Sequence, residues 1–187
     1  MGKYFGTDGV RAVAGQFPLT DDFIKKLGYC ALKELAPFAG KDRLKMQVVI
    51  ARDTRLSGPS ILQNLSAGIR AAGADVLDMG VAPTPAVAAA VKQSGSLCGV
   101  VISASHNPPE YNGYKVYGPD GCQITLEAAK KITGYIEQKD IFEDIRTGPF
   151  DSFLETGMIR YIDDDTIDAY FEAVKGYSLY EKGGDIK

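Results

Sequence analysis

The sequence predicts an α/β domain, built as a three-layer α/β/α sandwich around a mostly parallel mixed sheet of about four strands, one of them antiparallel at an edge. Short apolar runs that fit buried strands alternate with segments whose apolar residues recur at helical spacing. Strands that are apolar on both sides need helices on both faces of the sheet. Of the 187 residues, 45% are hydrophobic and 24% charged, which fits a globular chain and excludes a disordered or fibrous one.

The first half of the chain supplies most of the predicted elements. A helix is expected over residues 19–36, where Phe23, Leu27 and Ala31 share one face and Thr20 is placed to cap the N-terminus. Strands and helices then alternate: strand 46–51, helix 59–72, strand 75–79, helix 84–93 and strand 97–104. This order favours parallel strands joined by crossover helices.

Beyond residue 104 the pattern changes. Residues 114–117 follow a loop with Pro-Pro and Asn-Gly, so we expect a strand that returns antiparallel at an edge of the sheet. A helix is predicted over 125–137, a linker over 139–157, and a last helix over 163–176 whose three leading aspartates suit a helix N-terminus. We therefore predict one domain over residues 1–155, with 156–187 as a linker and the incomplete start of a second domain.

Composition excludes several classes of function. Lys and Arg total 21 against 24 Asp and Glu, with no long run of one sign, so neither nucleic acid nor a membrane surface is an expected partner. Three separated cysteines indicate neither a disulfide framework nor a zinc site, and no apolar run approaches the ~20 residues of a membrane span. We expect a reduced, cytoplasmic protein. Its single histidine, His106, excludes mechanisms that need two.

The segment 102–115 carries the candidate chemistry. Ser105 emerges where a buried strand ends, beside the imidazole of His106 and the amide of Asn107, and Lys115 follows ten residues later across an Asn-Gly turn. Ligands of open α/β sheets bind outside the carboxyl ends of the strands. A hydroxyl, a cation and hydrogen-bond donors together suggest a phosphate. Because phosphoserine and sugar phosphates are both monoesters of alcohols, exchange of a phosphoryl group between them is nearly thermoneutral.

The same residues leave alternatives to weigh. A serine hydrolase would use His106 as the base for Ser105, but neighbours in extended chain point to opposite sides, and the chain has no Gly-x-Ser-x-Gly elbow. A phosphoryl carrier therefore fits Ser105 better. For Arg52, Asp53 and Arg55, which follow another predicted strand, both direct ligand contact and local ion pairs or caps stay open.

Four ordered motifs resemble the α-D-phosphohexomutase superfamily, which includes phosphoglucomutase, phosphomannomutase and phosphoglucosamine mutase. The motif SASHNP at 103–108 is similar to the active-site phosphoserine signature of that superfamily. FGTDGVR at 5–11, RDTRLSG at 52–58 and NGYKVY at 112–117 agree with it in order and spacing. The resemblance covers essentially the whole chain.

The resemblance implies roles for individual residues. Ser105 would carry the phosphate, Lys115 would take part in proton transfer and phosphate contact, and Arg11, His106 and Asn107 would lie at the same site. The reaction implied is the interconversion of hexose 1-phosphate and 6-phosphate through a hexose 1,6-bisphosphate. The cofactor implied is Mg²⁺, bound in part through the phosphate on Ser105. Sugar phosphates would be the partners.

Departures from the family pattern shape the remaining expectations. The metal-binding loop, the sugar-selecting loop and the C-terminal phosphate-binding domain have no counterparts here, so we expect a fragment that is inactive alone, with the remaining domains absent. The opening residues 4–11 resemble phosphoglucosamine mutases, whereas 108–115 and 121–123 resemble the phosphoglucomutase and phosphomannomutase branch, which we favour. Phosphoglucosamine mutase and a non-catalytic phosphosugar-binding module are the alternatives.

Overall fold

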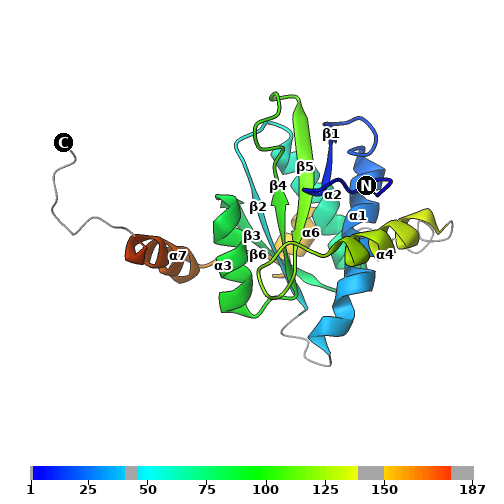
Figure 1. The fold of residues 1–187 in the computed structure, drawn as a ribbon. Helices are drawn as coiled ribbons and strands as arrows, with labels where there is room; N and C mark the ends of the chain where they lie inside the picture. The colour runs from blue at the N-terminus through cyan, green and yellow to red at the C-terminus, as the bar shows by residue number, and fades with distance from the viewer. Residues whose placement is uncertain (1, 41–45, 139–149, 178–187) are drawn as a thin grey trace.

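A computed structural model describes residues 2–40, 46–138 and 150–177 of the chain. Its centre is a six-stranded sheet in the order β1-β5-β4-β2-β3-β6 (Figure 1). The strands are β1 (Val10–Val13), β2 (Gln47–Arg52), β3 (Asp75–Val81), β4 (Cys98–Ile102), β5 (Tyr111–Tyr117) and β6 (Ile159–Tyr161). The predicted α/β class is confirmed.

One strand runs against all the others. The strands β4, β2, β3 and β6 are parallel neighbours, and β5 pairs antiparallel with both β4 and β1. The parallel strands β2, β3 and β4 therefore end at the same edge of the sheet. The loops that follow them meet there, as expected for the ligand-binding edge of an α/β sheet.

Helices cover both faces of the sheet (Figure 1). They are α1 (Asp21–Leu35), α2 (Gly58–Ala71), α3 (Thr84–Ser94), α4 (Leu126–Glu137), α6 (Phe150–Glu155) and α7 (Asp164–Gly176), with a 3₁₀ turn η1 (Ala36–Ala39) after α1. Alternation along β2 shows how the layers form. Val48 and Ile50 are buried in the larger core with α1, α2 and α4, while Val49 and Ala51 are buried in a smaller core with α3.

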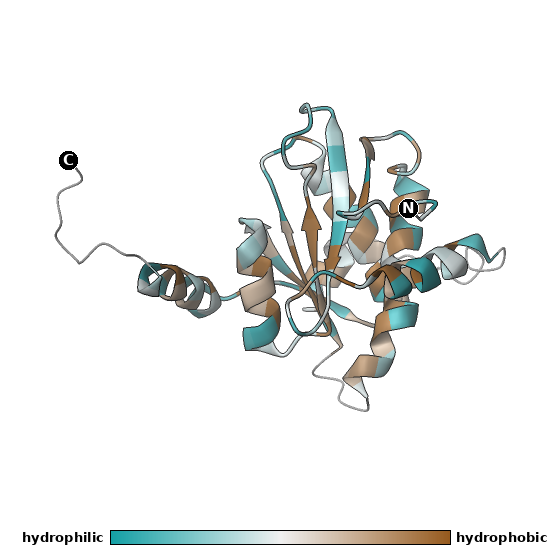
Figure 2. Ribbon diagram, viewed as in Figure 1, coloured by the Kyte–Doolittle hydropathy of each residue, from teal (hydrophilic) through white to brown (hydrophobic). Residues whose placement is uncertain are grey.

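The hydropathy of the ribbon follows the same division. In Figure 2 the central strands are brown, and the helices turn brown stripes toward them and teal stripes outward. The helix α7 lies against α3, and its Ile167 and Tyr170 pack on the smaller core. Farther along α7, Phe171 and Val174 are half exposed, where the helix extends away from the sheet (Figure 1).

Helix termini follow the capping residues of the sequence only in part. Thr125 caps α4 by accepting a hydrogen bond from the Ala128 N–H at 3.2 Å. Asp163 does the same for α7, accepting from the Thr166 N–H at 2.7 Å. Thr20 stands at the N-cap of α1 in extended conformation but makes no side-chain capping bond.

Three expectations about the sheet were wrong. It has six strands, not four, because β1 and β6 are only four and three residues long and too short for a recognisable alternation. The antiparallel strand β5 is not at an edge, since β1 pairs along its outer side. It also begins at Tyr111, not at residue 114.

The region after residue 138 also differs from the expectation. Residues 139–149, the first part of the predicted linker, lie outside the described residues. Within the second part, α6 forms, and its Phe153 and Leu154 pack against the larger core. The strand β6 then pairs with β3, so the sheet continues past residue 155. The domain boundary proposed from the sequence stays a prediction. In the part of the chain that the structure describes, no helix is both long and apolar enough to cross a bilayer.

Candidate active site

Ser105 lies in the loop of residues 103–110 that joins β4 to β5, here called the serine loop. The N–H of Asn107 donates to the Ala104 carbonyl at 3.1 Å and closes a turn, with Ser105 and His106 at its two central positions. Ser105 has a φ of 55°, the one positive value among the described non-glycine residues. That left-handed backbone costs roughly 1–2 kcal/mol and persists only where neighbouring contacts enforce it.

Hydrogen bonds from several sides hold this conformation. The Ser105 N–H donates to the Ser103 hydroxyl at 3.0 Å, and the Ser105 carbonyl accepts from the Arg55 guanidinium, also at 3.0 Å. The turn directs the side chains of Ser105 and His106 outward, and both residues are exposed. The Ser105 hydroxyl is therefore fixed in place and open to a ligand.

Lys115 is the residue that contacts the Ser105 hydroxyl. The strand β5 turns back beside β4 and places Lys115 opposite Val101. The Lys115 ammonium Nζ donates to Ser105 Oγ at 2.9 Å, although Lys115 itself is only 8% exposed. Burial, and next the positive charge of Arg11, lower the pKa of Lys115 from its ordinary value, while Asp8 and Asp53 oppose this shift.

Close packing of glycines brings the opening residues of the chain to this site. Gly9 has a φ of 99°, and a Cβ there would lie 2.1 Å from the Tyr114 carbonyl oxygen, so only glycine lets β1 approach β5. Gly113 is paired with Arg11 in the sheet, where a Cβ would lie 2.5 Å from the Ser103 carbonyl oxygen. The two glycines set Arg11 beside the strand that carries Lys115.

The other predicted site residues are placed differently. Arg11 pairs with Asp8 at 2.7 Å, and its Nε is buried with no hydrogen-bond partner among the described residues. Asn107 lines the same cavity as Ser105. The His106 side chain makes no hydrogen bond or ion pair within the described ranges, so it is not in contact with Ser105 as a base would be. The premise of extended backbone at these two residues was wrong, because they form a turn.

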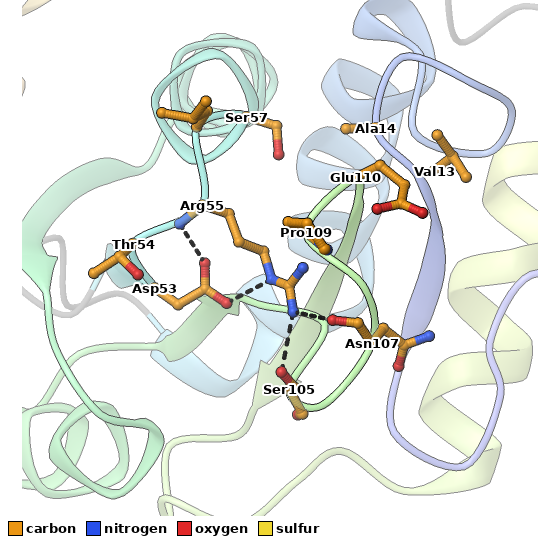
Figure 3. A pocket seen from close by; sticks show the side chains of 11 residues that line it. Val13, Ala14, Asp53, Thr54, Arg55, Ser57, Ser105, Asn107, Pro109 and Glu110 are labelled. Carbon is orange, nitrogen blue, oxygen red and sulfur yellow. Dashed lines mark hydrogen bonds and ion pairs between the residues drawn. The ribbon is translucent and has the colours of Figure 1, made fainter.

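A cavity of about 880 Å³ opens beside the serine loop (Figure 3). Its walls come from three segments: Val13 and Ala14 at the end of β1, residues 53–57 after β2, and residues of the serine loop. The segment 53–57 is here called the arginine loop. The cavity thus lies at the carboxyl edge of the sheet, and it is large enough for a small organic ligand.

The sequence left open what Arg55 does, and the structure gives the answer. Its side chain is 10% exposed and pairs with Asp53 at 2.9 Å (Figure 3). It also donates to backbone carbonyls of the serine loop and of β5. Asn112 and Ser57 form a second link between the same segments, from Nδ2 to Oγ, at 2.9 Å. The sequence placed both loops at the carboxyl ends of predicted parallel strands but carried no signal for these acceptors.

A metal site is not complete in these residues. In residues 2–40, 46–138 and 150–177, no group of three or more His, Cys, Asp or Glu side chains could hold a metal ion. A phosphate on Ser105 would therefore need further metal ligands from outside these residues. Magnesium stays a prediction.

The fold and the serine loop together define a class: an α/β/α domain that presents a serine, hydrogen-bonded by a lysine, at the ligand-binding edge of its sheet. Residues 2–142 match the family model described as phosphoglucomutase/phosphomannomutase, alpha/beta/alpha domain I. The chain belongs to this family, as its domain I, and hence to the α-D-phosphohexomutase superfamily that the four motifs resembled.

Individual relatives agree with this assignment. A phosphoglucosamine mutase of Clostridioides difficile (strain 630) is 46% identical over 148 residues, which are 79% of this chain and 32% of that protein. A phosphoglucosamine mutase of Geobacillus thermodenitrificans is 39% identical over 97% of this chain and 37% of its own length. The chain thus spans about a third of the length of these relatives.

A solved structure is similar over most of the chain. It is a phosphoglucomutase/phosphomannomutase family protein from Burkholderia thailandensis, with a TM-score of 0.68 and 31% identity over 93% of this chain and 35% of that one. These named relatives are all mutases or members of a mutase family.

Proposed function

We propose that this chain is the phosphoryl-carrying domain of a phosphohexomutase that interconverts hexose 1-phosphate and 6-phosphate. The observation that carries the proposal is the 2.9 Å contact between Lys115 Nζ and Ser105 Oγ at the cavity edge. A cation that touches the hydroxyl can hold a phosphate on it and can exchange a proton with it. Family membership and the mutase relatives support the same reaction.

The proposed step is a phosphoryl exchange between two alcohols. The bond between Ser105 Oγ and phosphorus breaks as the free hydroxyl oxygen of the sugar phosphate bonds to phosphorus, which gives a hexose 1,6-bisphosphate and free serine. The hydroxyl proton of the sugar passes to Lys115, whose lowered pKa eases access to the neutral amine, and Lys115 delivers a proton to the departing Ser105 Oγ that it contacts. After the bisphosphate reorients, Ser105 Oγ bonds to the other phosphorus as its hydroxyl proton passes to Lys115, and Lys115 gives a proton to the departing sugar oxygen.

Positive charge at the site suits the transferring group. Arg11 lies close enough to Lys115 to lower its pKa, and the buried Arg11 Nε has no partner among the described residues. The Arg11 side chain is 23% exposed, so a contact of its guanidinium with a phosphate oxygen fits the role that the family resemblance implies. His106 is exposed and Asn107 is half-buried, both in the serine loop, and we propose that both contact the ligand.

Substrate choice is the finer part of the proposal. Residues 108–115 and 121–123 favour glucose or mannose phosphates, as argued from the sequence. The names of the curated relatives favour glucosamine phosphate as the second candidate. Parallel assays with the three hexose phosphates, using the full gene product that contains this chain, distinguish them by their kcat/KM values.

Replacement of Ser105 tests the reaction class. In the full gene product we expect Ser105→Ala to lower mutase turnover by roughly 10⁴-fold or more, because no other hydroxyl takes over the covalent step. Ser60→Ala, at an exposed position on α2 outside the cavity lining, is the matched control and should leave turnover unchanged. Near-normal turnover in the Ser105 variant would remove the proposal and leave the phosphosugar-binding module as the better account.

A further inference from the structure

All five N–H groups of the Arg55 guanidinium are occupied by acceptors of the protein. The Nε–H donates to Asp53 Oδ2 at 2.9 Å. One terminal nitrogen donates to the Pro108 carbonyl at 2.5 Å and the Tyr111 carbonyl at 2.9 Å. The other donates to the Ser105 carbonyl at 3.0 Å and the Asn107 carbonyl at 2.8 Å. Because a guanidinium has five N–H donors, none is left for a ligand.

This saturation separates Arg55 from the phosphate-binding arginines of enzyme sites. An arginine that binds phosphate presents a free edge of its fork to the anion. Arg55 instead points that edge at four backbone carbonyls, which lie along residues 105–111 and converge on one planar group. Figure 3 shows the bonds to Ser105 and Asn107. A loop whose carbonyls converge in this way needs a donor at its centre, since the partly buried carbonyls of Asn107 and Tyr111 would otherwise lose their partner.

The conformation that Arg55 holds is the strained one at the reactive residue. Ser105 has a φ of 55°, and its carbonyl is one of the four acceptors. The carbonyl directions of Asn107 and Pro108 fix the other side of the same turn. Rotation of Ser105 to negative φ would swing its carbonyl and its Cβ together, so loss of the guanidinium would also move Oγ away from Lys115.

We propose that Arg55 is the positioning residue of the serine loop: it imposes the left-handed backbone of Ser105 and thereby sets Oγ on the Lys115 amine. Its acceptors specify a guanidinium and not simply a positive charge, because an ammonium has three donors and no planar fork. The consequence for catalysis rests on the proposed function, whereas the loop conformation does not.

NMR spectroscopy of the 187-residue chain tests this directly. In the wild type, positive φ brings the amide proton and Hα of Ser105 close, which gives a strong intraresidue NOE. We expect Arg55→Lys, which keeps the charge and the aliphatic stem, to weaken that NOE. Amide exchange at Asn107 and Tyr111, whose N–H groups close turns of the loop, should quicken by about tenfold or more.

Arg70 provides the matched control. It is 13% exposed, forms an ion pair with Asp75 and donates to the Ala74 carbonyl. These contacts lie at the C-terminal end of α2, whereas the arginine loop precedes its N-terminus. Arg70→Lys should leave the Ser105 NOE and the loop exchange unchanged. A second variant, Arg55→Ala, should lose the NOE and regain it when free guanidinium is added at a concentration that does not unfold the domain.

The other outcomes count against the positioning role of Arg55 or separate it from the proposed function. An unchanged NOE and unchanged exchange in Arg55→Lys would show that the loop holds itself. Loss of dispersed amide signals throughout Arg55→Lys, or equal loop changes in Arg70→Lys, would assign Arg55 to the stability of the whole domain. If the loop changes as expected while Ser105 takes up no phosphate in the full gene product, the proposed function fails and the positioning role stands.

Discussion

The serine loop after β4 and the arginine loop after β2 leave neighbouring parallel strands at one edge of the sheet, yet they contribute different things. The serine loop presents an exposed hydroxyl on a strained turn. The arginine loop presents a largely buried guanidinium whose donors are all taken by the serine loop, by the first residue of β5 and by Asp53. The serine loop supplies the reactive hydroxyl, and the arginine loop fixes the conformation of the serine loop.

This difference shows how an exposed residue can be well positioned. Ser105 is exposed, so hydrogen bonds with Ser103, Arg55 and Lys115 define its geometry. Such a site depends on backbone carbonyls as much as on side chains. Variants that separate the chemical group from its supports therefore test the comparison most sharply.

The largest effect short of removing the serine is expected at Lys115. Lys115→Met keeps the length of the side chain but removes the group that contacts Ser105 Oγ. We expect kcat of the full gene product to fall by about 10²–10⁴-fold, the usual contribution of a positioned acid or base. Lys131→Met, at a 53% exposed lysine of α4, is the control. Equal activity in the two variants would place the chemistry elsewhere.

The support behind the site should be sensitive to a single methyl group. In Gly9→Ala the new Cβ would meet the Tyr114 carbonyl oxygen at 2.1 Å, so we expect the free energy of unfolding to fall by about 2–4 kcal/mol. Gly15→Ala is the matched control, with a φ of 80° but nothing within 4 Å, and should cost about 1 kcal/mol. Equal losses in urea unfolding of the two variants would contradict the close approach of β1 and β5.

The lowered pKa of Lys115 gives a stability effect with a definite sign. Between that lowered pKa and the ordinary value of 10.5, the unfolded chain binds a proton that the folded chain has lost. The free energy of unfolding contributed by Lys115 therefore rises with pH through this window. Urea unfolding of the wild type and Lys115→Met should show the wild type gaining stability relative to the variant as pH rises toward 10.5. A difference in the free energy of unfolding that does not change with pH would mean that the pKa of Lys115 is not lowered.

The smallest effect is expected at the second link between the two loops. Ser57→Ala removes the hydroxyl that accepts from the buried Asn112 amide at 2.9 Å. We expect a loss of about 1 kcal/mol in the free energy of unfolding. Ser60→Ala, whose side chain is exposed, should change it by less than about 0.5 kcal/mol. If the two variants lose equally little stability, the Ser57–Asn112 bond contributes nothing measurable and Arg55 is the link that holds the loops together.

Much of the fold followed from the sequence because its signals are local. The buried strands β2 and β4 and the crossover helices have clear periodicity, and Thr125 and Asp163 are recognisable caps. The short strands β1 and β6 were missed because their place in the sheet depends on partners far along the chain. The glycines that admit β1 carry no periodic signal at all.

The candidate site was predictable in part for the same reason. Ser105 and Lys115 were placed together by the turn between them, a feature of one short segment, and the structure brings them to 2.9 Å. The role of Arg55 depends on carbonyls 50 to 56 residues away, so the sequence could only offer ion pairs or ligand contact as alternatives. Backbone acceptors leave no mark in the residue types of a loop.

The central claim is that Ser105 carries the phosphoryl group, and mass spectrometry tests it most directly. The full gene product that contains this chain is incubated with a hexose 1,6-bisphosphate, digested, and its phosphopeptides are sequenced. We predict one added phosphate per chain, located on Ser105 and absent from Ser105→Ala. Mutase turnover with no phosphate on Ser105, or with the phosphate on another residue, would contradict the account.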